Sequence, residues 1–244
     1  MKKIFITATD TDAGKTFVAC ALTKALINTG KKVAVYKPIA AGCRLEGESL
    51  INDDAQLLSQ FTNCDQKISD INPIAFFDPI APHIAAKKVD REISISDITQ
   101  GYQHIKAMNA DVIITEGAGG WRLPLAINDN ASDDKGKAIF LSDFAKTSQQ
   151  NVILVVNMKL GCLNHALLTY EMIKADGLHC IGWIANSASN EQMSNLVENI
   201  DALEQLLPIP KMAQFSFYSS LNMSLAEKIN AAAKEIDLTS VLIT

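Results

Sequence analysis

Two spacings of apolar residues alternate along this chain. Continuous apolar runs of strand length cover residues 3–8, 32–38, 111–117, 151–157 and 180–187. Such runs are typical of strands buried on both faces, as in a parallel sheet. Between them, apolar residues recur at helical spacing and predict helices over 15–29, 53–61, 164–176 and about 190–206. Gly30 and Gly177 stand directly after two of these helices, where glycine commonly ends a helix.

Strands that alternate with helices predict an α/β fold built on a parallel sheet flanked by helices. Each strand–helix–strand unit is expected to cross over with right-handed connectivity. The pattern has no internal repeat, no low-complexity segment and no convincing domain boundary, so we expect a single domain over residues 1–244. We expect the polar stretch NDNASDDKGK, residues 128–137, to form a mobile loop.

Composition and charge exclude several classes of protein. The 244 residues are 48% hydrophobic and 20% charged, which is ordinary for a globular protein that buries a sizeable core. The net charge of −5 disfavours a nucleic-acid partner. No apolar stretch reaches the roughly 20 residues of a membrane span, and the run after MKK is too short for a signal peptide.

The cysteines point to a reducing compartment. They are five, scattered, and form no C-x-x-C pair, at positions 20, 43, 64, 162 and 180. This pattern favours reduced thiols in a cytoplasmic protein and disfavours a metal cluster.

A phosphate-binding loop is the first candidate for chemistry. ATDTDAGKT, residues 8–16, ends in Gly-Lys-Thr between a predicted strand and a predicted helix. Gly14 allows close backbone approach to phosphates, Lys15 supplies a cation for them, and the Thr16 hydroxyl suits Mg²⁺. The usual motif opens with a glycine that four residues separate from this Gly-Lys-Thr run, and here Thr9 occupies that place. The context of strand and helix argues for a variant loop more than for a chance match.

Acidic residues at strand and helix ends offer ligands for a metal. Glu116 ends an apolar strand in ITEGAGG, at the sheet edge where α/β proteins bind ligands. Its carboxylate could hold Mg²⁺, or it could be a solvated side chain beside a turn. Asp53 and Asp54 stand at a predicted helix start, where capping is the simpler role.

Two further segments leave alternatives open. Lys37, at the end of the second strand in YKPIAAG, could act on a substrate or lie on the surface. KLGCLNHA, residues 159–166, opens a helix whose free N–H groups suit an anion, or it is an ordinary turn. His83 and His165 receive no catalytic role, because a lone histidine is more often structural.

Taken together, these stretches resemble the dethiobiotin synthetase family. The family signature is similar to Gly-Thr-Asp-Thr-x-x-Gly-Lys-Thr, with threonine at the position of Thr9. In family order, the chain also carries YKPIAAG, NP and then PH within 72–83, EGAGGW, PL at 124–125, KLGCLNHA and GWIAN. The match spans about residues 4–212, and two positions depart from it: Ala8 replaces a usual glycine, and Ala41 replaces a serine that touches substrate.

The resemblance implies a P-loop NTPase-like fold, a homodimer and an ATP-dependent ring closure. The substrates would be 7,8-diaminopelargonate, CO₂ and ATP, with Mg²⁺ as cofactor, and the products dethiobiotin, ADP and phosphate. A phosphorylated carbamate would be the intermediate. The family's catalytic lysines correspond to Lys15 and Lys37, and its metal ligands to Thr16, Asp54 and Glu116.

The resemblance also implies binding residues. Nucleotide would be bound by Asp12, Ala13, Gly14, Lys15, Thr16, Phe17, Asp54, Glu116, Gly117, Ala118, Gly119, Asn186, Ser187, Pro210, Lys211 and Met212. In that set Asn186 would read adenine. The diaminopelargonate would be bound by Thr11, Lys37 and Ala41, and its carboxylate by the partner subunit's copies of Gly161, Cys162, Leu163 and Asn164.

Two rival functions use related loops. Partitioning and nitrogenase-type ATPases, which use nucleotide as a conformational switch, typically carry a signature lysine early in the loop, where this chain has Asp10. Cobyrinate amidase-type ligases append a glutaminase domain, for which the 244 residues leave no room. A pure binding module fits least, given a phosphate loop, candidate metal carboxylates and Lys37 together.

Overall fold

A parallel sheet forms the centre of the protein. The computed structural model describes residues 1–127, 138–190, 193–217 and 223–243. Within them, six strands all run parallel. Their order across the sheet is β12 (Lys211–Phe215), β11 (Cys180–Asn186), β10 (Asn151–Asn157), β1 (Lys2–Ala8), β7 (Val112–Glu116) and β2 (Val33–Tyr36). The predicted α/β class is confirmed.

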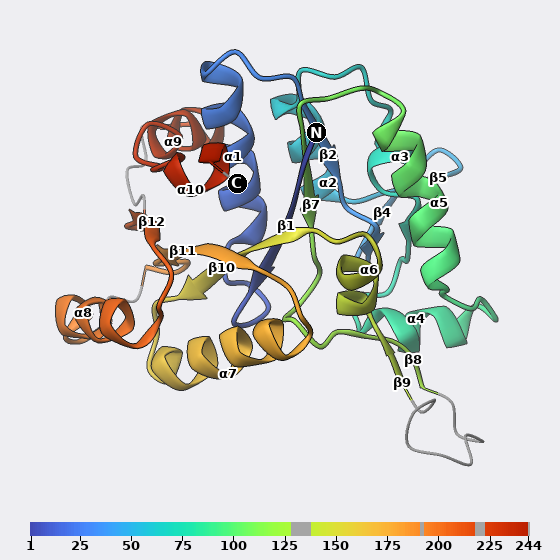
Figure 1. Ribbon diagram of the computed structural model, residues 1–244. Helices are drawn as coiled ribbons and strands as arrows, with labels where there is room; N and C mark the ends of the chain where they lie inside the picture. Colours follow the sequence, from blue (N-terminus) through green and yellow to red (C-terminus); the bar gives the residue numbers. More distant parts are fainter. Residues whose placement is uncertain (128–137, 191–192, 218–222, 244) are drawn as a thin grey trace.

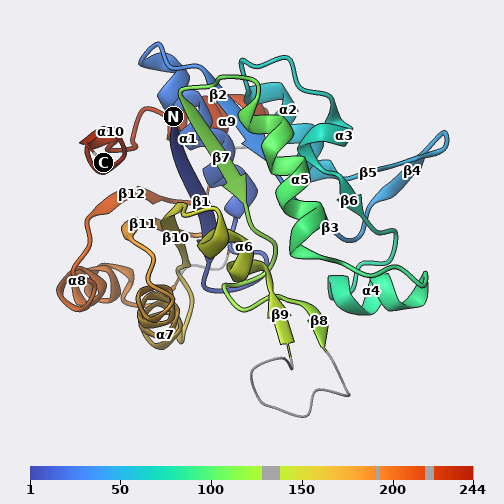
Figure 2. The same ribbon diagram turned by 45° about the vertical axis from the view of Figure 1, so that its right-hand side comes forward.

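Helices cover both faces of this sheet (Figures 1 and 2). One face packs against α1 (Lys15–Asn28), α2 (Asp53–Phe61), α3 (Ile68–Ile71), α9 (Leu225–Ala232) and α10 (Thr239–Ile243). The other packs against α5 (Ile95–Lys106), α6 (Leu141–Thr147), α7 (Cys162–Ala175) and α8 (Leu196–Leu206). Neighbouring residues of β1 serve opposite faces: Ile4 and Ile6 face α1, and Phe5 faces the other layer. This alternation is the period-two rule of a strand.

Short elements border the sheet. Helix α4 (Pro82–Lys88) begins with a proline, whose missing N–H is tolerated in a first turn. Three two-stranded pairings are β3 (Ile39–Ala40) with β6 (Ile74–Ala75), β4 (Arg44–Glu46) with β5 (Ser49–Ile51), and β8 (Pro124–Ile127) with β9 (Ala138–Phe140). No helix among the described residues is long and apolar enough to cross a membrane.

Strand register brings the candidate residues to one edge of the sheet. In β1 and β7, Ile6 pairs with Glu116, so the phosphate loop begins just beyond the level of that carboxylate. In β2 and β7, Tyr36 pairs with Thr115, and the next residues are therefore Lys37 and Glu116. The three segments meet at the carboxyl ends of adjacent strands, where open α/β sheets bind ligands.

The predicted elements are present, with shifted ends. Helix α2 has the predicted bounds, and Asn52 caps it by accepting a hydrogen bond from Ala55 N. Strand β2 ends at Tyr36 instead of residue 38, because Pro38 has no N–H to offer a sheet. Helix α7 begins at Cys162, two residues early, after Gly161 in a left-handed conformation. Helix α8 begins only at Leu196, and residues 191–192 lie outside the described residues.

Several elements were not predicted from the sequence. They are strand β12, the short strands of the three two-stranded pairings, and helices α3, α4, α5, α6, α9 and α10. The expected loop at 128–137 lies outside the described residues. The single domain over residues 1–244 stays a prediction, and the three core clusters that share one sheet support it.

Candidate active site

The phosphate loop lies between β1 and α1, and Thr9 is built into it. The Thr9 amide donates to Val155 O at 3.0 Å, and its hydroxyl accepts a hydrogen bond from Asn157 N at 3.1 Å. A glycine in this place could make only the first of these contacts. Ala8 is fully buried in the core beside Val155, so its methyl group does not narrow the mouth of the loop.

The loop ends where only glycine fits. Gly14 has a φ of +82°, a left-handed conformation that side chains disfavour, and it directly precedes α1. A Cβ atom at Gly14 would overlap the Asn186 side chain. That side chain donates from Nδ2 to Ala13 O at 2.8 Å, which ties the loop to the end of β11. The first N–H groups of α1 are thereby left to bind an anion.

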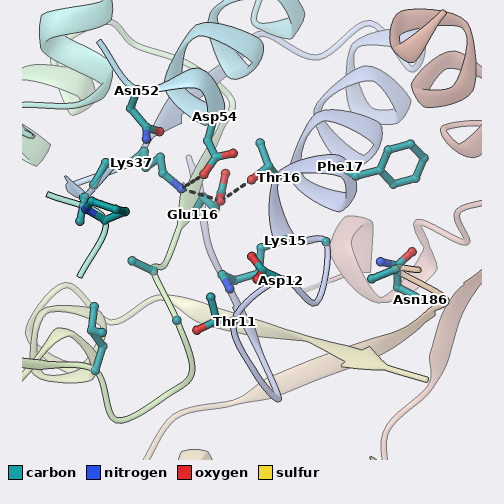
Figure 3. A pocket seen from close by; sticks show the side chains of 18 of the residues that line it. Thr11, Asp12, Lys15, Thr16, Phe17, Lys37, Asn52, Asp54, Glu116 and Asn186 are labelled. Atoms are coloured by element: carbon teal, nitrogen blue, oxygen red, sulfur yellow. Dashed lines mark hydrogen bonds and ion pairs between the residues drawn. The ribbon is translucent and has the colours of Figure 1, made fainter. Parts of the chain in front are cut away.

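Three charged side chains and one hydroxyl converge beside the loop (Figure 3). Lys37 Nζ lies 2.7 Å from Glu116 Oε1 and 2.9 Å from Asp54 Oδ2. The Thr16 hydroxyl donates to the same Glu116 oxygen at 2.8 Å. Lys15 lies below them on the loop and reaches Asp10 O at 3.4 Å. The fold thus brings together the predicted phosphate lysine, the predicted metal ligands and Lys37.

Burial and ion pairing oppose each other in this cluster. Burial alone would lower the pKa of Lys37, but Glu116 and Asp54 outweigh it and raise that pKa, so the amine stays protonated. Burial raises the pKa of Glu116, partly offset by Lys37. Burial also acts to raise the pKa of Asp54. The attraction between Asp54 and Lys37 outweighs burial, so the pKa of Asp54 is lowered. For Lys15, burial lowers the pKa, and Glu116 offsets part of the shift.

The oxygen atoms of this cluster fit a divalent cation. Glu116 Oε2 is buried and has no hydrogen-bond partner among the residues that the structure describes. A buried carboxylate oxygen without a partner is costly, so a ligand is expected there. Thr16 and Asp54 add a hydroxyl and a carboxylate, and Mg²⁺ prefers oxygen ligands. The described residues contain no group of three or more His, Cys, Asp or Glu side chains that could hold a metal, so the hydroxyl of Thr16 would be the third protein ligand here.

A cavity of about 980 Å³ runs past the cluster on both sides. Its volume is at the upper end for small-molecule sites. Predicted site residues that line it are Thr11, Asp12, Gly14, Lys15, Thr16, Phe17, Lys37, Ala41, Asp54, Glu116, Ala118, Gly119, Asn186 and Ser187. Figure 3 shows Lys37 and Asn52 on one side of the phosphate loop and Asn186 on the other, and we call these two parts of the cavity the Ala41 end and the Ser187 end.

Other predicted residues do not line this cavity. Ala13 belongs to the loop, but its side chain is buried in the core, and Met212 is buried beneath Gly182. Gly117, Pro210, Lys211 and the four residues 161–164 are also absent from the lining of the described part. The segment 161–164 does form the start of α7, as predicted.

The sequence did not reveal several lining residues. At the Ala41 end these are Asn52, Pro79, Ile80, Ala81, Pro82 and Leu123, and at the Ser187 end Ser216, Phe217, Leu225 and Lys228. The PH motif could have pointed to the first group. The second group carries no local signal, because its residues come from the segment after β12 and from α9.

Comparison with known proteins identifies the family. A family model described as an AAA domain matches residues 2–223. An ATP-dependent dethiobiotin synthetase of Alteromonas mediterranea is 43% identical over 225 residues, which cover 91% of this chain and 94% of the relative. The chain belongs to the ATP-dependent dethiobiotin synthetase family. A second family member, from Pseudoalteromonas translucida, is 44% identical over 87% of this chain and 89% of its own length.

Solved structures of other proteins share the fold of this dethiobiotin synthetase family member. The MinC:MinD cell division complex of Aquifex aeolicus gives a TM-score of 0.53 at 17% identity, covering 95% of this chain and 86% of that one. A ParA family ATPase of Chlorobium tepidum gives 0.51 at 16% identity, covering 100% and 93%. At these identities the likeness concerns the fold alone, and it confirms the predicted P-loop NTPase-like sheet.

Proposed function

We propose that this protein forms dethiobiotin from 7,8-diaminopelargonate, CO₂ and ATP, releasing ADP and phosphate. The observation that carries the proposal is the buried Lys37, level with Glu116 and facing a phosphate loop. The membership of the dethiobiotin synthetase family supports the same reaction. A nucleotide site alone would need no second buried lysine beside the metal ligands.

The lining of the cavity supports a placement of the substrates. The triphosphate binds over residues 12–17, with Lys15 beside the transferring phosphoryl group. The nucleoside extends toward Asn186 and Ser187, and diaminopelargonate occupies the end with Thr11, Lys37 and Ala41. The binding roles of Ala13, Gly117, Ala118 and Gly119 are backbone roles, since a short side chain adds no polar group. Pro210, Lys211 and Met212 are weaker candidates, because they do not line the cavity.

The reaction proceeds in three steps. One substrate amine attacks CO₂, forms a C–N bond and loses a proton, which gives an anionic carbamate. A carbamate oxygen then attacks the γ-phosphorus, and ADP leaves with the electrons of the cleaved P–O bond. The second amine attacks the carbamoyl carbon, loses a proton and closes the ring, and phosphate departs.

The two lysines make the second step possible. An anionic carbamate and the γ-phosphate repel each other, and positively charged groups placed in advance reduce that repulsion. Lys37 is kept protonated by its carboxylate neighbours and serves the carbamate. Lys15 neutralises charge on the phosphoryl group that is transferred. Both side chains are buried, so their charges act in a medium where water screens them little.

Thr16, Asp54 and Glu116 would hold Mg²⁺. The unpartnered Glu116 Oε2 supports this assignment. The ion would supply charge neutralisation of the triphosphate when bound. The Ala41 departure removes one hydroxyl from the substrate end, and the loss concerns one hydrogen bond to substrate, not the reaction.

We also propose a two-fold homodimer in the cytoplasm, with Gly161–Asn164 of each subunit serving the partner's site. These residues begin α7 but do not line the cavity of their own chain. Leu160, just before α7, is 95% exposed, and Leu168 within α7 is 63% exposed, so apolar side chains are available to a second copy. Five free cysteines, all within the described residues, fit a reducing compartment.

The nucleotide-switch function is disfavoured by Asp10. The switch ATPases typically carry a lysine in this position. Here the residue is Asp10, which forms an ion pair with Lys159 at 2.5 Å. The Asp10 carboxylate is therefore paired within its own subunit, and its negative charge would repel the phosphates of a nucleotide.

Isotope transfer tests the proposed function. Purified protein is incubated with ATP, Mg²⁺, diaminopelargonate and ¹³C-bicarbonate, and the product is analysed by mass spectrometry. The proposal requires dethiobiotin with one ¹³C atom in its ureido carbon. Release of ADP without that product would contradict it.

A further inference from the structure

A carboxylate at the far end of α7 is bonded to the segment that follows Glu116. Asp176 Oδ2 accepts a hydrogen bond from Trp121 Nε1 at 2.8 Å, and Oδ1 accepts one from Arg122 Nη2 at 2.9 Å. We propose that Asp176 is a positioning residue, which fixes residues 117–120, here called the glycine segment, beside the reacting groups. This inference rests on the proposed function.

The carboxylate is largely buried and pairs with two cations. Trp121 is 4% exposed, and the Asp176 side chain is 7% exposed. Lys146 of α6 adds a second cation 3.3 Å from Asp176 Oδ1. Burial acts to raise the pKa of Asp176, but the hydrogen bonds from Arg122 and Trp121 and the two cations lower it. A buried, ionised carboxylate with fixed donors holds its partners in one geometry.

Trp121 and the glycine segment pack against the same side chain, Phe5. Its ring meets the ring of Phe5 edge to face, with centroids 5.8 Å apart. Gly117 lies on the same Phe5 ring, where an added Cβ would come within 2.9 Å. The segment is therefore held at its start by Glu116 in the sheet and at its end by Trp121.

The glycine segment lies against the phosphate loop. A Cβ at Gly119 would be 3.8 Å from Thr11 Oγ1, and one at Gly120 would be 3.6 Å from Ala8 O. Ala118 and Gly119 line the cavity directly after Glu116. Release of the Trp121 end would thus loosen the wall that faces both substrates.

Arg122 fixes the next part of the wall. It donates to Ser142 Oγ at 3.0 Å, and its guanidinium lies 5.4 Å from the centre of the Phe140 ring. Leu123, which follows it, lines the cavity. Asp176 therefore holds two consecutive residues that lie between Gly119 and Leu123, both of which line the cavity.

Two variants break the contact in different ways, and a third is their control. Trp121→Phe keeps a ring in the core but removes the donor to Asp176. Asp176→Asn keeps an acceptor oxygen but removes the charge. Trp183→Phe is the matched control, since Trp183 is fully buried and its Nε1 has no hydrogen-bond partner among the described residues.

Two readouts are measured on each protein: steady-state dethiobiotin formation, and hydrogen exchange of amides in residues 117–123. We expect Trp121→Phe and Asp176→Asn to lower kcat about tenfold, because displacement of site groups by ~1 Å can cost up to about 10²-fold. We expect their segment amides to exchange faster, and the KM for ATP to change by less than about threefold, since residues 12–17 are untouched. Trp183→Phe should match the wild type in both readouts.

Wild-type kcat in both folded variants overturns the inference, whatever the exchange shows. Lower kcat without faster exchange in 117–123 overturns it too, because the loss then has another origin. If the wild type forms no dethiobiotin, the proposed function fails, and the exchange measurement alone decides whether Asp176 holds the segment.

Discussion

Lys37 and Glu116 form an ion pair inside the protein: Nζ and Oε1 are 2.7 Å apart, and the side chains are 4% and 1% exposed. Burial of two charges is costly unless each is paired and hydrogen-bonded. The register of β2 against β7 creates the pair, because Tyr36 opposite Thr115 puts the following residues level. Such an arrangement contributes little net stability, so its role is best sought in chemistry.

Replacement of Lys37 should separate chemistry from nucleotide binding. We expect Lys37→Gln to lower kcat at least about 10²-fold, as loss of one positioned charge commonly does. The nucleotide Kd should stay within about threefold of the wild-type value, because Lys15 and the loop are intact. Calorimetric titration with the nucleotide and a product assay measure the two quantities. Lys88→Gln, an exposed lysine paired with Asp78, is the control and should change neither.

The same variant should lower stability, because it leaves Glu116 buried without its main cation. Loss of one partner of a buried pair typically costs about 3–5 kcal/mol. The double variant Lys37→Gln, Glu116→Gln should unfold at a higher urea concentration than Lys37→Gln alone, yet remain inactive. A double variant no more stable than the single one would mean that the pair is not the source of the loss.

Removal of the Glu116 or Asp54 carboxylate should change the Mg²⁺ concentration that the enzyme requires. Glu116→Gln and Asp54→Asn should each raise the Mg²⁺ concentration for half-maximal activity, because each removes one anionic oxygen ligand. Asp53→Asn is the matched control: its side chain is 85% exposed, pairs with Arg44 and precedes Asp54 directly. Mg²⁺ titrations that coincide with wild type in both test variants would remove these carboxylates from the site.

Two glycines with the same backbone angle should differ in effect. Gly14 and Gly30 have φ of +82° and +83°, so alanine strains both by about 1–2 kcal/mol. Only at Gly14 does the new Cβ overlap Asn186 and displace its bond to Ala13. Gly14→Ala should weaken nucleotide binding by about tenfold or more, since a buried polar group loses its partner. Gly30→Ala should bind nucleotide like the wild type; equal weakening by both would contradict the close fit.

Mixed dimers test the shared site. Lys37→Gln and Asn164→Trp are each expected to be inactive. We choose Asn164 within the segment 161–164 because the φ of +94° at Gly161 would strain any side chain there. When the two variants are unfolded and refolded together, half of the dimers are mixed, and one of the two sites in each is intact. Activity should return to roughly a quarter of the wild-type value. No recovery, with mixed dimers verified by native mass spectrometry, would place each site within one subunit.

Local sequence patterns predicted the centre of this site. Gly14, Lys15 and Thr16 are contiguous, and Glu116 and Lys37 each follow a strand whose apolar run is unmistakable. Helix α2 was predicted with its observed bounds from apolar residues at helical spacing, although its cap is Asn52 and not Asp53 or Asp54. Parallel strands bring such ends together by a general rule, so the meeting of these residues needed no knowledge of contacts.

The far ends of the cavity depend on contacts that no local pattern reveals. Strand β12 has only five residues, KMAQF, with too short a pattern to separate strand from loop. The wall formed by Phe217, Leu225 and Lys228 arises only when α9 packs on α1. The Trp121–Asp176 bond joins residues 55 positions apart. Helix α5 was the avoidable omission, since Ile98, Tyr102 and Ile105 are buried at positions i, i+4 and i+7.

The dependence of ATP cleavage on both co-substrates tests the central claim most directly. Purified protein with Mg²⁺ and ATP is assayed for ADP release in four mixtures: neither co-substrate, diaminopelargonate alone, bicarbonate alone, and both. If phosphoryl transfer goes to a carbamate held by Lys37, ADP appears at a substantial rate only in the complete mixture, in equal amount to dethiobiotin. ATP cleavage at the full rate without diaminopelargonate or without bicarbonate would contradict the account.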